Sequence, residues 1–213
     1  MEIYYEEKEN VLIYVNKDRK YYIPVLGYMD KKDYNPSWRH VRRIAVRAII
    51  NVDDRNLMVY MDHDKYYAFP GGGVEGKETL EEALVREVKE ETGYEIIPCT
   101  IKPFASVINV KSNEYFNNQK EIFDNISVYF KAEVFDKEHV PKLTPSGVGR
   151  GMRRLKVYAQ QAYAHNESIL AKARSPHLDF IRREDLVLKE LIETNQSPRI
   201  VGHHCMDMPS RMF

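Results

Sequence analysis

The sequence predicts an α/β or α+β sandwich, in which helices pack on the faces of a sheet. Several segments rich in Ile, Val and Leu read as strands, and they stand before and after a segment with clear helical periodicity. Two more helical segments follow towards the C-terminus. Because a sheet and a helix each bury one apolar face, strands mixed with helices of this length pack in layers. The 213 residues suffice for one domain of good size with an extension.

The chain is predicted to begin with an extension that precedes the main domain. Residues 10–29 contain two strand-like runs around a polar turn, which is typical of a β-hairpin. Residues 30–38 carry charge, Asn-Pro and a turn-forming Ser, and we expect a linker there. Residues 1–39 therefore form the predicted hairpin extension and linker, ahead of a main domain at 40–195.

The main domain opens with two strands, at residues 44–51 and 57–62, around a turn at 53–56. Further strands are expected at 102–110 and 126–134, with a long polar loop between them. Later segments of the domain complete the prediction, namely a short strand at 155–158 and helices at 160–171 and 177–194. The tail at 196–213 has no clear period and is expected to be irregular.

Composition and charge exclude several classes of protein. Lys plus Arg and Asp plus Glu balance at 32 each, so bulk charge indicates neither a nucleic-acid partner nor a membrane surface. No apolar run is long enough to span a bilayer, and the acidic N-terminus lacks the pattern of a signal peptide. Two cysteines cannot form a disulfide framework, which fits a cytoplasmic location.

The strongest pattern is a helix that follows a glycine-rich loop. Thr79 and Glu82 match a capping box, so the helix is expected to begin just after Thr79. Gly93 suits the left-handed residue beyond a helix end. The apolar stripe of this helix begins with Leu80, Ala83 and Leu84, and the same spacing continues into Glu87, Glu90 and Glu91.

These three carboxylates lower the stability of the helix at the positions they occupy. Like charges three and four residues apart repel by a few tenths of a kcal/mol per pair. The negative end of the helix dipole adds roughly 0.3–1 kcal/mol per acid. A solvated acidic face explains Glu75, Glu81 and Glu82 well, but it does not explain carboxylates in register with an apolar stripe. A bound divalent cation removes the contradiction, because Mg²⁺ prefers carboxylate oxygens and can also hold a phosphate.

The same stretch resembles the Nudix box. Each fixed position of that motif is matched at its spacing, with a slight departure at Tyr94, where an aliphatic residue is usual; the matching residues are Gly72, Glu78, Arg86, Glu87, Val88, Glu90, Glu91 and Gly93. The resemblance implies a Nudix hydrolase, with an α/β/α sandwich that holds a mixed sheet. Such enzymes use Mg²⁺ or Mn²⁺ to hydrolyse a nucleoside diphosphate linked to another moiety.

The resemblance also implies roles for individual residues. Glu87, Glu90 and Glu91 would be the metal-ligand carboxylates, with the carbonyl of Gly72 as a further ligand. Arg86 would orient a carboxylate through an ion pair with Glu78. The glycines at 71–73 would let the backbone approach the metal and the phosphate closely.

The general base varies among Nudix enzymes, and we expect it to be Glu87. Many members that act on ADP-ribose-like substrates carry an acid in a late loop, but residues 141–153 contain no Asp or Glu. Glu121 and Asp124, in the expected long loop, remain candidates for the base.

Substrate contacts are expected from basic and aromatic residues near the glycine loop. Arg47 lies on a strand face that it shares with Ala45 and Ile49, where it either lines the pocket or forms an ion pair at the sheet edge. One of Tyr66, Tyr67 and Phe69 would stack on a base, although core packing is the commoner fate of such residues. Further basic residues are candidates for phosphate contacts in a closed state, namely Lys142, Arg150, Arg153 and Arg154.

Three functions remain open at this point. The first is hydrolysis of a nucleoside diphosphate derivative, with ADP-ribose or a nucleotide-sugar favoured and a nucleoside triphosphate second. The second is a binding module that senses a nucleotide without cleaving it. The third is an isomerase of the same fold, which is disfavoured because Cys99 is expected in a strand. The hairpin edge leaves a homodimer open, and the adjacent His203, His204 and Cys205 lack the spacing of a zinc site.

Overall fold

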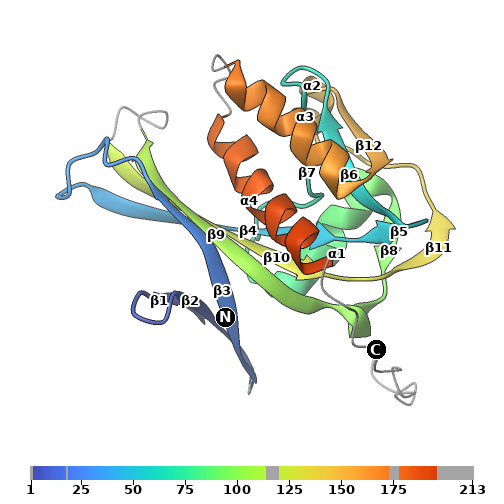
Figure 1. Cartoon of the computed structure of the whole chain (residues 1–213). Helices are drawn as coiled ribbons and strands as arrows, with labels where there is room; N and C mark the ends of the chain where they lie inside the picture. The colour runs from blue at the N-terminus through green and yellow to red at the C-terminus, as the bar shows by residue number, and fades with distance from the viewer. Residues whose placement is uncertain (1, 18, 114–119, 173–177, 196–213) are drawn as a thin grey trace.

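The computed structural model of the protein describes residues 2–17, 19–113, 120–172 and 178–195. Strands form a curled mixed sheet, with helices packed on both of its faces (Figure 1). The predicted layered α/β fold is therefore confirmed. None of the helices in these four ranges is long and apolar enough to cross a membrane.

The largest sheet has six strands in the order β1-β2-β3-β9-β10-β4. Its inner strands are long because pairing continues over most of their length: β10 runs parallel to β4 and antiparallel to β9, and β3 runs parallel to β9. The bounds of the six strands are Glu2–Glu6, Val11–Asn16, Arg19–Asp30, Arg39–Ile49, Lys102–Asn113 and Glu121–Lys131, for β1, β2, β3, β4, β9 and β10 in that order.

Two smaller sheets complete the strands. In the first, β12 pairs with β6, which also pairs with β5 and β7. In the second, β11 pairs with β8. Their bounds are Asn51–Val52 for β5, Arg55–Met61 for β6, Tyr66–Ala68 for β7, Tyr94–Ile96 for β8, Val134–Glu138 for β11 and Met152–Val157 for β12.

Side chains that alternate along β9 and β10 divide the core into two halves. Ile108 and Val128 belong to the half that contains helix α1, Leu80–Thr92. Val107 and Tyr129 face the other way, into the half that contains helices α3, Ala159–Ala171, and α4, Leu178–Asn195. The sheet is thus buried on both faces, as expected for a sandwich with helices on each side.

Helix α1 begins and ends as the sequence predicts. The Thr79 hydroxyl accepts a hydrogen bond from the Glu82 amide, and the Glu82 carboxylate accepts one from the Thr79 amide, which completes the capping box. Gly93 stops the helix with a φ of 74°, and a Cβ there would collide with the carbonyl of His139. Both ends of the helix that carries the carboxylates are therefore fixed by local sequence.

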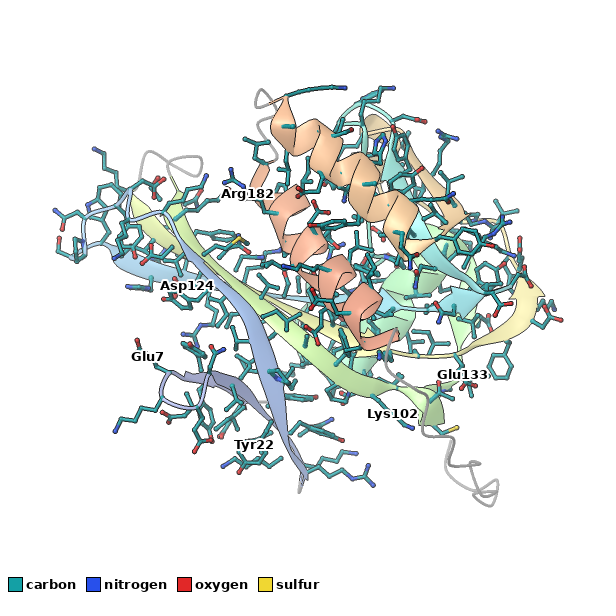
Figure 2. The ribbon with its side chains drawn as sticks, viewed as in Figure 1. Glu7, Tyr22, Lys102, Asp124, Glu133 and Arg182 are labelled. Carbon is teal, nitrogen blue, oxygen red and sulfur yellow. The ribbon has the colours of Figure 1, made fainter. Side chains whose placement is uncertain are left out.

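The predicted hairpin is present as β2 and β3, and β1 adds a third strand to it. Tyr14 and Asn16, both on β2, donate hydrogen bonds to Glu81 on α1. Strand β3 continues past the hairpin and joins β9, so the extension shares the main sheet. On the hairpin's outer face Tyr22 is 58% exposed, and Figure 2 shows it pointing away from the rest of the protein.

Four sequence-based boundaries are corrected by the structure. β10 ends at Lys131, and β11 is a separate strand with a different partner. Residues 111–113 and 121–125, expected in a polar loop, extend β9 and β10, because ladder pairing with each other and with β4 outweighs their polarity.

The segment 141–153 contains helix α2, Pro145–Gly149, which is capped by the Thr144 hydroxyl. Cys99 lies exposed in the 3-10 helix η1, Pro98–Thr100, where proline begins a turn. The predicted tail at 196–213 is outside the described residues.

Candidate active site

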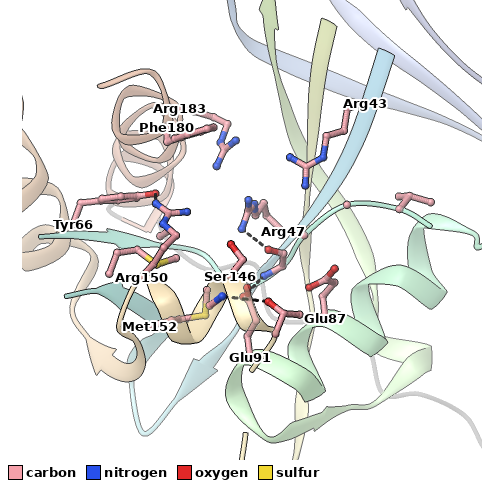
Figure 3. Close-up of a pocket in the computed structure, with 18 of the residues that line it drawn as sticks. Arg43, Arg47, Tyr66, Glu87, Glu91, Ser146, Arg150, Met152, Phe180 and Arg183 are labelled. Carbon is pink, nitrogen blue, oxygen red and sulfur yellow. Dashed lines mark hydrogen bonds between the residues drawn. The ribbon is translucent and has the colours of Figure 1, made fainter. Parts of the chain in front are cut away.

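A cavity of about 500 Å³ opens beside the C-terminal half of α1. Its lining comes from segments that are far apart in the sequence: the glycine loop, β4, the segment that includes α2, and α4 (Figure 3). Carboxylates lie on the α1 side, and arginines lie around the remainder. The fold therefore gathers both signs of charge around one space.

The glycine loop runs along β4 like a further strand. The amide of Val46 donates to the carbonyl of Gly72 at 2.9 Å, and the amide of Val74 donates to the carbonyl of Ile44 at 3.0 Å. Gly71 has a φ of 142°, and a Cβ added there would lie 2.1 Å from the carbonyl oxygen of Val46. A side chain is thus excluded, and the loop backbone is held close to the cavity.

Two carboxylates of α1 line this cavity. Glu87 is only 8% exposed, and Glu91 accepts a hydrogen bond from the amide of Gly71 at 2.8 Å. Burial raises the pKa of the Glu91 carboxyl to about 7, and the positive charge of Arg47 opposes this shift only in part. The positive charges around Glu91 therefore do not fully compensate its carboxylate. This agrees with the sequence argument that carboxylates in register with the apolar stripe of α1 are unfavourable.

Arg86 ties the carboxylates to the loop. Its guanidinium donates to Glu78 at 2.7 and 2.9 Å, to Glu87 at 2.8 Å, and to the carbonyl of Gly73 at 3.0 Å. The two hydrogen bonds with Arg86 lower the pKa of Glu78, and the same bonds raise the pKa of Arg86. The ion pair with Glu78 is the contact expected from the sequence, and it holds Arg86 where it can fix the orientation of Glu87.

Glu90 lies apart from the other two acids. It lines a neighbouring pocket with Lys89 and Lys142, and its carboxylate is 3.5 Å from Arg86. Within the described ranges, no three or more His, Cys, Asp or Glu side chains converge as a metal site. Glu87 and Glu91 nevertheless fit a cation, because both are acidic, border one cavity and lie beside a glycine loop. A Cβ at Gly72 would lie 2.4 Å from Glu87, so Gly72 leaves the space that this carboxylate occupies.

Arg47 lines the cavity and forms no ion pair at the sheet edge among the described residues. It donates to the carbonyl oxygens of Phe69 and Gly71, and its Nε is buried without a hydrogen-bond partner. Of the late basic residues, Arg150 also lines the cavity, and it donates to Asp64 and to the hydroxyl of Tyr66.

The other three late basic residues do not line this cavity. Arg153 pairs with Asp62, Arg154 pairs with Glu138, and Lys142 lines the neighbouring pocket. The expectation that they contact substrate phosphates therefore has no support in this arrangement.

Helix α4 completes the opposite wall with a buried ion pair. Arg183 is 3% exposed, and its Nε and Nη2 donate to Glu184 at 3.0 and 2.6 Å. Glu184 also accepts from the amide of Phe69 at 3.1 Å and from the hydroxyl of Tyr129 at 3.3 Å. The helix therefore anchors the residue before the glycine loop while it presents an arginine to the cavity.

Of the three aromatic residues that were candidates to stack on a base, Tyr67 and Phe69 do not line this cavity. Phe69 is fully buried in the core, where its ring packs edge-on against Tyr129. Tyr67 packs against Tyr60 and His165 instead. Alternation along β7 explains this result, since Tyr66 takes the position that faces the cavity.

The two alternative candidates for the general base are also placed elsewhere. Glu121 and Asp124 lie in strand β10, not in a loop, and Figure 2 shows Asp124 on that long strand. Glu121 pairs with Arg39, and Asp124 lies 3.0 Å from His40. Neither lines the cavity. The residues His203, His204 and Cys205 are outside the described residues.

Several cavity residues were missed from the sequence, above all Arg43, Phe180 and Arg183. Arg43 carried a usable signal, because residues 43, 45 and 47 of a strand share one face. Helix α4 carried another: Glu184 continues the stripe of Ile181 and Leu188, which is the pattern that singled out the acids of α1.

The fold is a sheet with helices on both faces, and the site places carboxylates at the end of a helix against a glycine loop. This combination of fold and site is that of the Nudix class. The family model described as "NUDIX domain" matches residues 41–167. The chain therefore belongs to the Nudix family.

Individual relatives are more distant. An ADP-ribose pyrophosphatase of Methanocaldococcus jannaschii is 35% identical over 47% of this chain and 65% of its own length. The nucleoside triphosphatase NudI of Escherichia coli is 33% identical over 40% of this chain and 70% of its own. This chain thus spans slightly less than two thirds of the archaeal relative. A solved NUDIX hydrolase from Nitrosomonas europaea matches 73% of this chain and 89% of its own, with 20% identity and a TM-score of 0.44.

Proposed function

We propose that this protein hydrolyses the diphosphate linkage of a nucleoside diphosphate derivative with the help of Mg²⁺ or Mn²⁺. The observation that carries the proposal is the cavity itself, in which the acids of α1 stand beside the glycine loop and opposite four arginines: Arg43, Arg47, Arg150 and Arg183. A diphosphate and a divalent cation together complement both signs of charge, whereas neither complements the whole cavity alone.

Glu87 and Glu91 would hold the cation. Glu90 points to Arg86 and the neighbouring pocket, and it would have to turn towards the cation to become a further ligand. A bound divalent cation neutralises charge on the diphosphate and makes a water more acidic. Glu91 supports this assignment, because burial keeps its pKa near 7 and a nearby positive charge would favour its ionised form. Gly72 is a weaker candidate, since its carbonyl already accepts from the amide of Val46.

Glu87 is the proposed general base, and Arg86 is the residue that positions it. Arg86 contacts Glu87, Glu78 and the carbonyl of Gly73 at once, so it fixes the carboxylate relative to the loop. The segment 141–153 lines part of the cavity through Ser146 and Arg150 but supplies no acid. Arg47 would bind substrate phosphate, and its buried Nε is free to donate.

The substrate proposed first is ADP-ribose or a nucleotide-sugar, and a nucleoside triphosphate comes second. The archaeal relative is named for the first kind and the bacterial relative for the second. A phosphate-release screen with Mg²⁺ tests the proposal, using ADP-ribose, nucleotide-sugars, dinucleotides and nucleoside triphosphates with the wild type and Glu87→Gln. Mg²⁺-dependent hydrolysis of one class, lost in the variant, is expected. Nucleotide binding without hydrolysis of any class would overturn the proposal in favour of a sensing module.

A further inference from the structure

The arginines of the cavity do not share one environment. Arg150 and Arg183 each form an ion pair, with Asp64 and Glu184 respectively. Arg43 forms no hydrogen bond or ion pair with the described residues, although it borders the same space. One unpaired guanidinium therefore stands near an arginine that a buried partner holds in place.

Arg43 and Arg183 lie on opposite sides of one gap and point towards each other, with Arg47 below them (Figure 3). The pKa of Arg43 is lowered first by burial and then by the positive charges of Arg47 and Arg183. Like charges that are brought together without an anion repel one another, and an anion between them removes the repulsion. The carboxylates of α1 present the opposite case, in which negative charges repel one another until a cation binds between them.

We propose that Arg43 and Arg183 form a second anion subsite, which binds a phosphate group that the substrate carries in addition to the diphosphate linkage that is cleaved. The inference rests on the proposed function, and within that function it favours a substrate with an additional phosphate over ADP-ribose. Two sources supply this chemistry, namely the terminal phosphate of a triphosphate and a phosphate ester on the ribose. ADP-ribose itself carries neither.

The position of the subsite separates it from the proposed cleavage site. Arg47 is bound to the carbonyl oxygens of Phe69 and Gly71 and lies near Glu91, so it belongs with the glycine loop. The Nη2 of Arg43 lies 3.2 Å from where a Cβ of Gly73 would stand, two residues further along the loop than the carbonyl of Gly71 that Arg47 contacts. Arg183 comes from α4, which lies beyond the matched residues 41–167. The subsite is therefore a feature of this chain that the family match does not assign.

The structure also prepares Arg183 for an anion. Two hydrogen bonds to Glu184 fix its Nε and Nη2, which leaves Nη1 to donate. Glu184 is itself held by the amide of Phe69 and the hydroxyl of Tyr129, so the guanidinium is oriented before any ligand arrives. The ring of Phe180 lies beside it, with the guanidinium carbon 5.4 Å from the ring centroid. A charge-assisted hydrogen bond gains strength in such a poorly hydrated setting.

The test compares ligand pairs that differ by one phosphate. Equilibrium binding is measured with Mg²⁺ for the α,β-methylene analogues of ATP and ADP, and for ADP-ribose with and without a 2′-phosphate. The wild type is expected to bind the more phosphorylated member of one pair at least about tenfold more tightly, since one charge-assisted hydrogen bond is worth roughly that much. The pair that shows the preference identifies the source of the phosphate.

Arg43→Gln and Arg183→Gln should each reduce that ratio to less than about threefold, with less effect on the shorter ligand. Arg153→Gln is the matched control, because Arg153 pairs with Asp62 outside the cavity, and it should leave the ratio unchanged. If Arg183→Gln fails to fold, Arg43→Gln decides the test, since Arg43 forms no ion pair with the described residues whose loss would destabilise the fold. A wild-type ratio near one in both pairs, or a ratio that survives Arg43→Gln, would overturn the subsite. Because binding needs no turnover, a protein that binds with this preference but hydrolyses nothing would refute only the proposed function.

Discussion

The cavity has an acidic wall of carboxylates and a basic wall of arginines, and the residues of the two walls are distributed differently along the sequence. Glu87 and Glu91 stand one helical turn apart on α1, and the neighbouring Arg86 ties Glu87 to the glycine loop. The basic wall takes Arg43 from β4, Arg150 from the end of α2 and Arg183 from α4. One wall is therefore a local feature of a helix, and the other exists only after the whole domain has folded.

This difference separates two kinds of tolerance to substitution. The acidic wall depends on spacing within α1, so a single change there alters charge while the helix persists. The basic wall depends on packing: Glu184, fully buried, joins α4 to the amide of Phe69 and to Tyr129 of β10. A change in that wall is expected to alter both the charge and the position of the helix.

The largest expected effect is at the acidic wall. Glu87→Gln should lower turnover by at least about a hundredfold, which is the range for loss of a general base or a metal ligand. Metal affinity measured beside the rate separates the two roles, because loss of a base alone leaves metal binding nearly intact. Glu121→Gln is the control and should cost much less, since Glu121 pairs with Arg39 away from the cavity. An inactive Glu121→Gln with an active Glu87→Gln would place the base outside α1.

The acidic wall could be predicted from the sequence because one helix holds it. The start of α1 at Leu80, its stop at Gly93 and the run of carboxylates along its buried face all follow from spacing within a single element. The hairpin and the layered fold were also predictable, since apolar periodicity reports which elements exist. The direction of the Glu90 side chain could not be predicted from spacing, because residues at the edge of a helical face turn towards whichever neighbour the tertiary packing supplies, here Arg86.

The basic wall could not be predicted from spacing in the same way. Whether Arg183 meets Arg43 depends on how α4 crosses the sheet, and no local pattern encodes that crossing. The fate of Phe69 shows the same limit, since an aromatic residue before the glycine loop serves the core or the site according to its strand register. The predicted strand lengths were wrong for a related reason: β10 extends to Glu121 because β4 and β9 are present to pair with it.

The next effect concerns the stability of the basic wall. Glu184→Gln removes the charge partner of a fully buried arginine, which should lower the free energy of unfolding by about 3 kcal/mol. Urea unfolding of the metal-free protein measures it. Glu190→Gln on the same helix is the control, because Glu190 forms no ion pair with the described residues, and it should change stability by less than about 0.5 kcal/mol. Equal effects of the two substitutions would mean that the pair with Arg183 does not support the wall.

A third effect distinguishes the walls by the ion that each binds. Mg²⁺ should raise the melting temperature of the wild type, because it binds the folded site preferentially, with a stabilisation of about 2.7 kcal/mol at a hundred times Kd. Glu90→Gln combined with Glu91→Gln should abolish the shift. Arg43→Gln should keep it, since the basic wall supplies no metal ligand. A double variant that responds to Mg²⁺ as the wild type does would refute the assigned ligands.

The smallest expected effect is a pH-dependent gain in stability without metal. The folded protein raises the pKa of Glu91 from 4.5 to about 7, so the folded state holds a proton that the unfolded state releases between these values. This carboxyl therefore costs stability as pH rises from about 4.5 to 7, and the cost is complete above pH 7. Glu91→Gln keeps an acceptor for the amide of Gly71 but removes the charge.

Its unfolding free energy should equal that of the wild type near pH 4 and exceed it by on the order of 1 kcal/mol at pH 8, a modest figure because Glu91 is only partly buried. Urea unfolding at both pH values in chelator measures the difference, with Glu95→Gln as a control whose pKa is lowered by Lys89, so that this substitution should instead lose stability at high pH. A Glu91→Gln variant less stable than the wild type at pH 8 would show that the ionised carboxylate is a structural partner of Arg47, and the acidic wall would then be built by long-range pairing like the basic one.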